Sequence, residues 1–416
     1  MAQPKHKKDM VADSGHPGDS VDDSIRLGDE ASGLFKIAAG IGVVGMVLAV
    51  VLGGGLTHQQ FQHSYLTAFM WGLSIGAGAL WWVTLQHLVG ARWSVAVRRI
   101  GELLAQSLGL MAALSLPVVV PMLLGNDSLY RWVSHEYMAS EHVLEGKTGY
   151  LNVSFFVVRC VIYFGFWALM ARYFLKASVA QDKSGDASIT ARMGRASPLT
   201  MIGFALTLTF CAVDFLMSLD AIWFSTIFGV YYFSGCVLAV HSTMVLALIW
   251  LQRKGHLLRS VTVEHYHDLG KMMFAFTAFW TYIAFSQFML IWYANIPEET
   301  FWYHMRLEGA WWPATLALAI LHFPVPFFGL MSRQIKRNKT TLALGAIYLL
   351  IIHWYDMYWL VAPNLHSEPV FHAADFAAWA GVGGLIVAFV VWKARSVNLL
   401  PTKDPRLQRS LAFENI

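Results

Sequence analysis

His353 and Asp356 lie three residues apart in the apolar run "LLIIHWYDMYWL", residues 349–360. On a helix, this spacing places an imidazole and a carboxylate one turn apart on the same face. Histidine, with a pKa of about 6.5, can pass a proton in either direction. Ionisable groups inside a membrane are costly unless they have a partner or face water. The pair therefore indicates proton chemistry within a membrane-spanning helix.

Further ionisable residues are predicted at membrane depth, and a rise of about 1.5 Å per helical residue gives each a level. From the cytoplasmic to the outer side they are His87, Glu102, His241, His322, His353, Arg159, Asp214 and Asp356. We interpret this set as a path for protons, with Glu102 and His87 at its cytoplasmic mouth. Arg159 is expected to pair with an aspartate, and Arg159 and Asp214 are expected to neighbour Asp356 across the bundle. A structural explanation stays open for each residue, as a core histidine or as an ion pair that only joins helices.

The elements that carry these residues follow from composition. The chain has 416 residues, of which 56% are hydrophobic and 13% charged, and its mean hydropathy is +0.50. This is too apolar for one soluble domain and predicts an all-α polytopic membrane protein. A net charge of +4, without a basic groove, gives no support to nucleic-acid binding. The three cysteines show no CxxC or CxxCH spacing, so we expect no metal, iron–sulfur cluster or attached c-type haem in this chain.

About ten transmembrane helices are predicted, since each needs roughly 20 mostly apolar residues. They fall at residues 34–56, 64–88, 100–124, 152–175, 199–218, 226–251, 271–293, 311–332, 340–361 and 373–394. We therefore divide the chain into a mobile cytoplasmic arm (1–33), a transmembrane domain (34–395) and a cytoplasmic C-terminal tail (396–416). The arm is polar and has no apolar core with a cleavage site, so it is not expected to be a signal peptide.

Basic residues predict the orientation of the chain. Lys and Arg concentrate in the N-terminal region, in alternate loops and in the C-terminal tail. The opposite loops hold only Arg131, Lys147 and Arg306, and Arg159 lies within a span. Because basic residues favour the cytoplasmic side of short loops, both termini are predicted to be cytoplasmic.

Two stretches carry a resemblance to a known family. They are "CAVDFLMSLDAIWFSTIFGVYYFSG", residues 211–235, and "HDLGKMMFAFTAFWTYIAFSQFMLIWYANIPEET", residues 267–300. Both resemble the signature segments of ActF-type subunits of bacterial alternative complex III, within the wider NrfD/PsrC-like family. The number of spans, the orientation and the length agree over residues 34–395. In the signature segments lie Asp214, Asp220, Trp223, Tyr282, Gln287, Glu298 and Glu299, whose individual roles the resemblance does not fix.

The resemblance implies a multi-pass subunit of the bacterial inner membrane, folded as two four-helix bundles plus two extra helices. It implies a quinol:cytochrome c oxidoreductase of respiratory or photosynthetic electron transport, in which this chain provides a proton-conducting path coupled to quinol oxidation. The implied partners are an NrfD-like quinol-binding paralogue, an iron–sulfur subunit, multihaem and monohaem cytochrome c subunits, and membrane lipid. The haems and clusters would belong to those partners, with quinol as the substrate and no redox centre in this chain.

Other functions stay open. Direct quinol binding would use His353 and Asp356 with the aromatic side chains of Trp354, Tyr355 and Trp359. A secondary transporter could use the same buried charges, although no internal repeat is visible, and a structural scaffold is also possible. A b-type haem is disfavoured because Pro363 separates His353 from His366, and no other span carries two well-spaced internal histidines.

Overall fold

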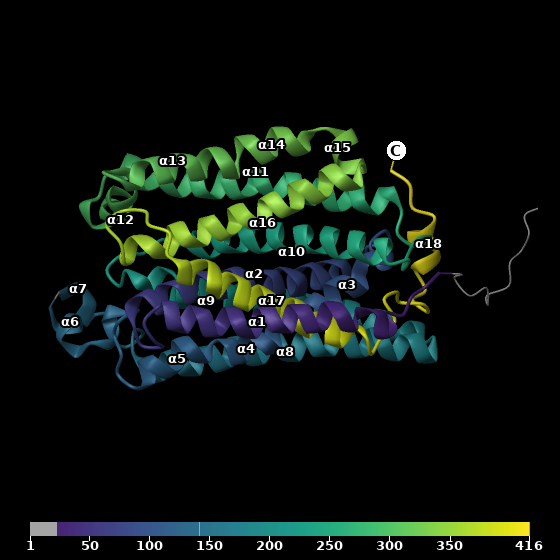
Figure 1. Cartoon of the computed structure of the whole chain (residues 1–416), viewed down its shortest axis with the longest axis horizontal. Helices are drawn as coiled ribbons and strands as arrows, with labels where there is room; N and C mark the ends of the chain where they lie inside the picture. The colour runs from purple at the N-terminus through teal and green to yellow at the C-terminus, as the bar shows by residue number, and fades with distance from the viewer. Residues whose placement is uncertain (1–22, 141, 416) are drawn as a thin grey trace, which may run out of the picture.

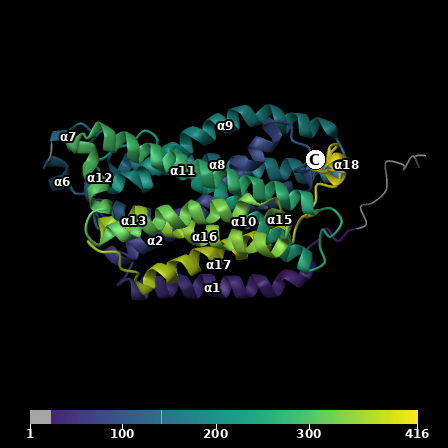
Figure 2. The ribbon, with the colours of Figure 1, turned by 90° about the horizontal axis from the view of Figure 1, so that it is seen from above.

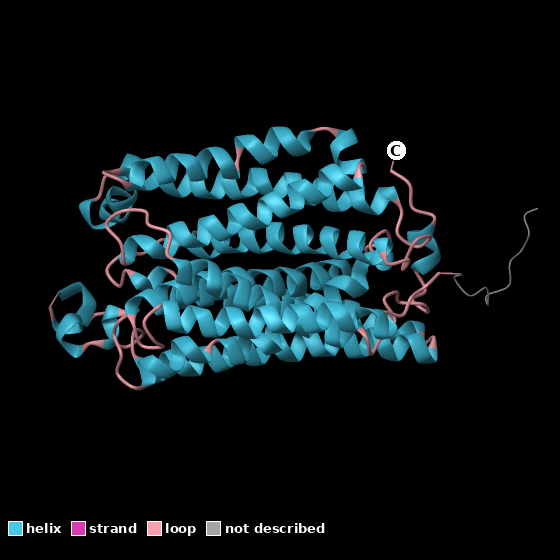
Figure 3. Ribbon diagram, viewed as in Figure 1, coloured by secondary structure: helices cyan, strands magenta, loops and turns pink. Residues whose placement is uncertain are grey.

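The computed structural model describes residues 23–140 and 142–415. In this part of the chain the secondary structure is helical and no strand is formed, as Figure 3 shows. Ten helical segments are long and apolar enough to cross a membrane. The ten predicted spans are thereby confirmed as helices, in the architecture of a multi-pass membrane protein.

Eight of the ten spans are single helices and two are broken. The single helices are α1 (Ser32–Leu52), α2 (Gln59–Leu88), α8 (Val153–Ser184), α9 (Ala187–Phe215), α10 (Phe228–Arg253), α11 (Val263–Ala294), α16 (Lys339–Val361) and α17 (Ala373–Ala394). The broken spans are α3 (Val95–Ala105) with α4 (Ser107–Leu114) and α5 (Leu116–Leu123), and α13 (Trp311–His322) with α14 (Pro324–Met331). The short helices are η1 (Gly28–Ala31), η2 (Arg131–Val133), α6 (His135–Ala139), α7 (His142–Glu145), η3 (Met217–Leu219), α12 (Pro297–Leu307), α15 (Arg333–Arg337), η4 (Ala362–Asn364) and α18 (Leu407–Leu411).

The spans can be described as two groups of contacting helices and a pair that packs against α2. One group contains α2, the broken span α3 to α5, α8 and α9, and the other contains α10, α11, the broken span α13 to α14, and α16. Helix α2 joins the groups through its contacts with α10 and α16. Helices α1 and α17 pack on each other and lie along one edge of the molecule in the view of Figure 2.

The α1–α17 pair is held close by glycines. A Cβ built on Gly45 would lie 2.6 Å from the backbone N of Gly381, and one on Gly384 would lie 2.6 Å from the N of Gly42. No real Cβ fits at such a distance, so the two backbones touch directly. Small residues at this kind of spacing let membrane helices pack by van der Waals contact and backbone approach.

Both described ends of the chain lie at the same end of the bundle, which we name the termini end (right in Figure 1). The other end, with α6, α7 and α12, is the distal end. Asp23 accepts hydrogen bonds from the backbone N–H groups of residues 258–260, and the Ser24 hydroxyl lies 2.8 Å from Nδ1 of His256. Leu27 is buried. The predicted mobile arm is therefore too long, because residues 23–33 are packed on the domain; residues 1–22 lie outside the described residues.

The basic stretch between the fourth and fifth spans was expected to be a loop, and the structure corrects this. Helix α8 continues to Ser184, and α9 starts at Ala187. Gly185 takes the left-handed conformation with φ of 70° that ends a helix, and the Asp186 side chain accepts the N–H of Ser188 to start the next. Hydropathy marked where the apolar segment ends, whereas these cap residues mark where the helices end.

Candidate functional site

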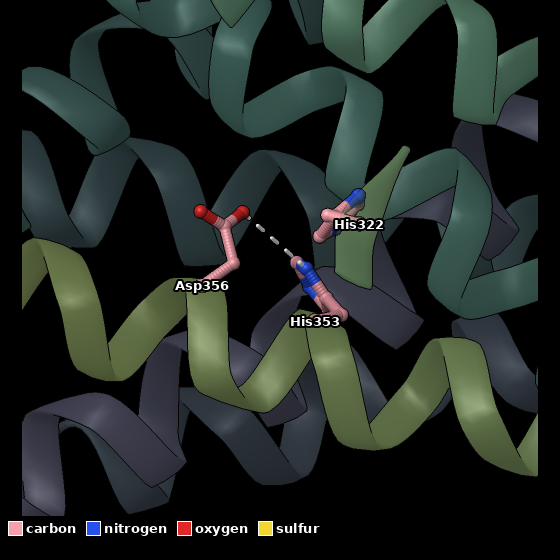
Figure 4. A group of neighbouring side chains, drawn as sticks. All are labelled: His322, His353 and Asp356. Atoms are coloured by element: carbon pink, nitrogen blue, oxygen red, sulfur yellow. Dashed lines mark ion pairs between the residues drawn. The ribbon is translucent and has the colours of Figure 1, made fainter. Parts of the chain in front are cut away.

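Three of the predicted residues form one buried cluster. Figure 4 shows His353 and Asp356 on α16, with His322, the last residue of α13, facing them. One side-chain N or O atom from each of the three lies within 4.8 Å of the others. Nδ1 of His353 lies 4.0 Å from Oδ2 of Asp356, and all three residues are inaccessible to solvent. Spacing in the sequence could not predict that His322 lies beside His353 and Asp356, because it is on a different helix.

Asp356 is held by donors from two other helices. The hydroxyl of Tyr231 on α10 donates to Oδ1, and the indole Nε1–H of Trp280 on α11 donates to Oδ2 over 3.1 Å. Both oxygens of the buried carboxyl group thus have a partner. Neither donor was predicted, although both lie in the segments that carry the family resemblance.

The hydrogen bonds of His353 define where a mobile proton can sit. The Ser74 hydroxyl on α2 donates to the Trp71 carbonyl over 2.6 Å, so its oxygen is left to accept from Nε2–H of His353 over 2.9 Å. A neutral imidazole with its proton on Nε2 carries a lone pair on Nδ1. Nδ1 has no hydrogen-bond partner and faces Oδ2 of Asp356. One additional proton can therefore move between these two atoms once they approach within hydrogen-bond distance.

His322 lies where the eighth span breaks. Pro324 and Pro326 have no N–H, so the usual backbone bonds to the carbonyls of residues 320 and 322 cannot form. The ring of His322 stacks on Trp280 with a centroid distance of 3.7 Å. Both ring nitrogens lack a hydrogen-bond partner in the described structure. A broken helix thus places a second titratable imidazole beside Asp356.

Arg159 and Asp214 form the predicted ion pair, but not at the cluster. Nε and Nη2 of Arg159 lie 2.8 and 2.9 Å from the two carboxylate oxygens of Asp214, and the Tyr163 hydroxyl donates to the same group over 2.7 Å. The described partners of Asp356 are Tyr231, Trp280 and His353 instead. The expectation that Arg159 and Asp214 neighbour Asp356 is therefore wrong, because α8 and α9 belong to the other group of helices.

His241 also lies apart from the cluster. Its Nδ1 is bonded to the carbonyl of Val237, four residues earlier on α10, over 2.7 Å, and its ring lies against Trp82. This is the structural explanation that the sequence left open for a buried histidine. Its Nε2 is buried without a partner in the described structure.

The predicted cytoplasmic mouth is a buried ionic network. Arg98 and Arg99, counted as loop residues from the sequence, lie inside α3 and are fully buried. Glu102 accepts from both, over 3.3 and 2.9 Å. Arg98 also pairs with Asp404 of the C-terminal tail over 2.5 Å. Glu102 is thus held between two guanidinium groups rather than lying at an open mouth; the "RRIGE" spacing of three and four residues was the signal available in the sequence.

His87, the other residue of that mouth, is buried and stacks on Phe174 with a centroid distance of 5.3 Å. Neither ring nitrogen has a partner in the described structure. No contact between His87 and Glu102 is formed within the described part of the chain.

The five residues proposed to contact quinol do not share one surface. Trp354 stacks on Trp379 with a centroid distance of 4.9 Å, away from the cluster. The Tyr355 hydroxyl donates to the carbonyl of Ala314, and Nε1–H of Trp359 donates to the hydroxyl of Thr315, both over 2.8 Å. The set predicted from neighbouring positions in sequence is therefore corrected, because successive helical residues point about 100° apart.

The two signature segments contact each other at the distal end, where residues 217–228 meet the last turns of α11 and the first turns of α12. Nε1–H of Trp223 donates to the carbonyl of Glu299 over 3.0 Å, and its ring stacks on Trp302 with a centroid distance of 4.3 Å. Gln287 accepts from the Ser225 hydroxyl over 3.0 Å. The other residues named in these segments are Asp220, which is partly buried, Tyr282, which is exposed, and Glu298, in the first turn of α12.

The cluster fits a proton better than a metal ion. Zinc bound by His and Asp at about 2.0–2.2 Å requires ligand atoms much closer to one another than the 4.8 Å limit that contains this set. Both oxygens of Asp356 already accept hydrogen bonds. As arranged, the three residues would have to move to enclose an ion, and the expectation that this chain binds no metal remains a prediction.

Comparison of the sequence with protein-family models and with curated proteins gives no match. The family resemblance of residues 211–235 and 267–300 thus remains a prediction, and function has to be argued from the site.

Proposed function

We propose that the chain is a proton-conducting membrane subunit of a quinol:cytochrome c oxidoreductase of the alternative complex III type. The observation that carries the proposal is the buried cluster of His353, Asp356 and His322 within the spans. Burial of three titratable groups is costly, and such groups in membrane proteins commonly mark proton or ion pathways. Nδ1 of His353 and Oδ2 of Asp356 face each other at 4.0 Å, and these two atoms can share one proton.

In this proposal, Asp356 and His353 exchange a proton as nearby charge changes during quinol oxidation. Tyr231 and Trp280 hold the carboxyl group in place, and Ser74 fixes the imidazole so that Nδ1 faces it. His322, whose ring nitrogens have no hydrogen-bond partner in the described part of the chain, is the neighbouring acceptor. These residues hold and move protons; electrons would pass through the partner subunits.

The wider assignment rests on the resemblance together with the arrangement of the helices. The ten helical spans, with α1 and α17 packed on each other, support the fold that the resemblance implies. We therefore propose an NrfD-like subunit in the bacterial inner membrane with cytoplasmic termini, so that the distal end faces outward. Its proposed partners are a quinol-binding paralogue, an iron–sulfur subunit and cytochrome c subunits.

The test uses the purified complex in proteoliposomes. We expect Asp356→Asn to reduce protons translocated per electron by about tenfold or more, since a carboxamide cannot take up the proton, while electron transfer changes much less. Asp268→Asn, at the other end of the bundle on α11, is the matched control. An unchanged proton-to-electron ratio in Asp356→Asn contradicts the proposed function. Co-purification of multihaem cytochrome c and iron–sulfur subunits tests the assignment to the complex.

Direct quinol binding is the second candidate because of an apolar cavity of about 360 Å³ between α2, α3, α10 and α17. Trp71 and Leu350 line this cavity. Trp71 lies three residues before Ser74 on α2, and Leu350 lies three residues before His353 on α16, so the cavity is close to the hydrogen bond between Ser74 and His353. Such a cavity suits an isoprenoid tail with its headgroup near the cluster. A photoreactive quinone should then label this chain near Leu350; labelling confined to another subunit excludes the candidate.

A further inference from the structure

A polar cavity of about 660 Å³ opens at the distal end. Its wall is formed by the start of α2, the segment with η2 and α6, and the residues after η3 and α16. The titratable and charged side chains on this wall are His63, Asp127, Arg131, Glu136, Tyr137 and Asp220. Polar groups of this density favour water, so the cavity extends the aqueous phase toward the spans.

Asp220 is a partly buried carboxylate on this wall. It follows η3, and its Oδ2 atom is buried without a hydrogen-bond partner in the described structure. Burial raises the pKa of the Asp220 carboxyl above its usual value, although the positive charges of Arg306 and Arg131 act to lower it. Asp220 thus lines the cavity, while its Oδ2 atom is buried and can accept a further hydrogen bond.

Arg306 on α12 is a fully buried cation between this carboxyl group and the cluster. Its guanidinium donates to the carbonyls of Trp302 and Leu360, each over 3.0 Å, and lies 3.6 Å above the Trp302 ring. Within the described residues, no carboxylate forms an ion pair with it. Burial lowers the pKa of Arg306 to about 10, with Asp220 acting to raise it, so the group stays charged at neutral pH.

The position of Arg306 links the cavity to the cluster. Leu360, which accepts its hydrogen bond, is one helical turn beyond Asp356 on α16. Arg306 also interacts electrostatically with Tyr231, whose hydroxyl donates to Asp356. Arg306 thus interacts electrostatically with Tyr231 on the side of the cluster and with Asp220 on the wall of the cavity.

We propose that Asp220 is the proton-exchange site between the buried cluster and the distal cavity, with Arg306 as the fixed cation that separates the two. This inference rests on the proposed function and names its outer route. When Asp356 is protonated, it can donate to the Tyr231 oxygen once the tyrosine O–H has turned away from it. Transfer of the Asp356 proton to that oxygen is then matched by release of the tyrosine's own proton through water to the Asp220 carboxylate, so Tyr231 is neutral before and after the step. Asp220 then releases the proton into the cavity. The positive charge of Arg306 opposes the passage of free hydronium and so limits leakage.

The Asp214 carboxylate, which was predicted near the outer side, is a poor alternative for this role. Its oxygens accept from two nitrogens of Arg159 and from the hydroxyl of Tyr163, and Arg159 also donates to the Tyr150 carbonyl over 2.9 Å. Both oxygens of Asp214 thus already have partners, and one of those partners is a guanidinium group. Asp220 has a carboxylate oxygen without a hydrogen-bond partner among the described residues, and it lines the cavity.

The test compares Asp220→Asn with Asp127→Asn in proteoliposomes of the whole complex. Both remove one carboxylate from the cavity wall, but Asp127 is exposed and interacts with neither Arg306 nor the cluster in the described structure. We expect Asp220→Asn to lower the rate of proton appearance at the outer face by about tenfold while electron transfer is retained, and Asp127→Asn to leave both unchanged. Asp220→Glu should restore most of the rate and shift its pH dependence.

Two further variants separate the possible failures. Tyr231→Phe keeps the ring and removes the relay hydroxyl, so it should resemble Asp220→Asn. If Asp356→Asn stops proton translocation but protons appear at the outer face as fast in Asp220→Asn as in Asp127→Asn, the outer route is wrong and the proposed function stands. If Asp356→Asn translocates protons normally, the proposed function itself fails. The inference would be overturned if Asp220→Asn lowers the rate of proton appearance, Asp220→Glu does not restore that rate, and the complex loses subunits. Asp220 would then have a structural role.

Discussion

At the scale of single residues, the position of His353 depends on the absence of a side chain at Gly235. A Cβ at Gly235 on α10 would lie 2.5 Å from Cε1 and 2.9 Å from Nδ1 of His353. Gly235→Ala should therefore displace the imidazole and weaken its bond to Ser74. We expect the free energy of unfolding to fall by about 1–3 kcal/mol, as overpacking a filled core does. Thermal or chemical unfolding in detergent measures this change.

Two comparisons show whether the imidazole is the cause. Gly165→Ala on α8 is the control, because a Cβ there meets nothing within 4 Å. In a His353→Ala background, Gly235→Ala should cost much less, since the ring that it would clash with is gone. An equal cost in both backgrounds would mean that the glycine serves α10 itself and not the cluster.

The sequence predicted well which side chains lie near each other on the same helix, and poorly which side chains of different helices meet. The His353–Asp356 spacing followed from helical period, and the Arg159–Asp214 pair followed from a shared level in the membrane. Tyr231, Trp280 and Ser74 were missed because a hydroxyl or indole in an apolar segment gives no signal of its role until the neighbouring helix is placed.

At the scale of elements, the contact between α1 and α17 depends on Gly45 and Gly381. Gly45→Ala would place a Cβ 2.6 Å from the Gly381 nitrogen, and backbone atoms cannot move aside as a flexible side chain can. We expect this variant to lose about 1–3 kcal/mol of stability through separation of the two helices. Gly40→Ala, in the same helix with nothing within 4 Å of its Cβ, should be neutral or slightly stabilising. Equal melting temperatures for the two variants would contradict the close-packing explanation.

Helix existence was predictable, but helix ends and breaks were only partly so. Hydropathy located all ten spans because the membrane requires a long apolar segment. Hydropathy ended the fourth span too early and started the fifth too late. Helices α8 and α9 extend beyond the apolar segments, and their ends are set by Gly185 and Asp186. The interruption at His322 was visible as prolines in the sequence, whereas the stacking of His322 on Trp280 depends on how the broken span packs against α11.

At the scale of the whole molecule, the termini end is closed by the C-terminal tail. Leu399 and Leu400 are buried, and the Ser410 hydroxyl accepts from the backbone N–H of Ala96 over 3.0 Å. Asp404 joins this segment to α3 through Arg98. The C-terminal tail predicted from the sequence is therefore packed over the end of the bundle that holds Glu102, and its attachment includes a buried ion pair.

That attachment predicts a response to pH. Burial acts to raise the pKa of the Asp404 carboxyl, but Arg98 and Arg406 outweigh it and hold that pKa below its usual value. A carboxyl group with a lowered pKa in the folded state stabilises that state at neutral pH, and the contribution is lost as pH falls below about 4 and through the folded pKa.

Asp404→Asn should remove this contribution at every pH and leave the Arg98 charge buried with less compensation. We expect opening of residues 398–411 to become easier by about 3 kcal/mol at pH 7, measured as faster backbone hydrogen exchange of this segment. The wild-type tail should approach the exchange of the variant only in acid. Asp29→Asn, which breaks the exposed ion pair with Arg395 at the same end, is the control and should change little. Equal protection of the tail in wild type and Asp404→Asn at pH 7 would show that apolar burial of Leu399 and Leu400, and not the Arg98–Asp404 pair, fastens the tail to the bundle.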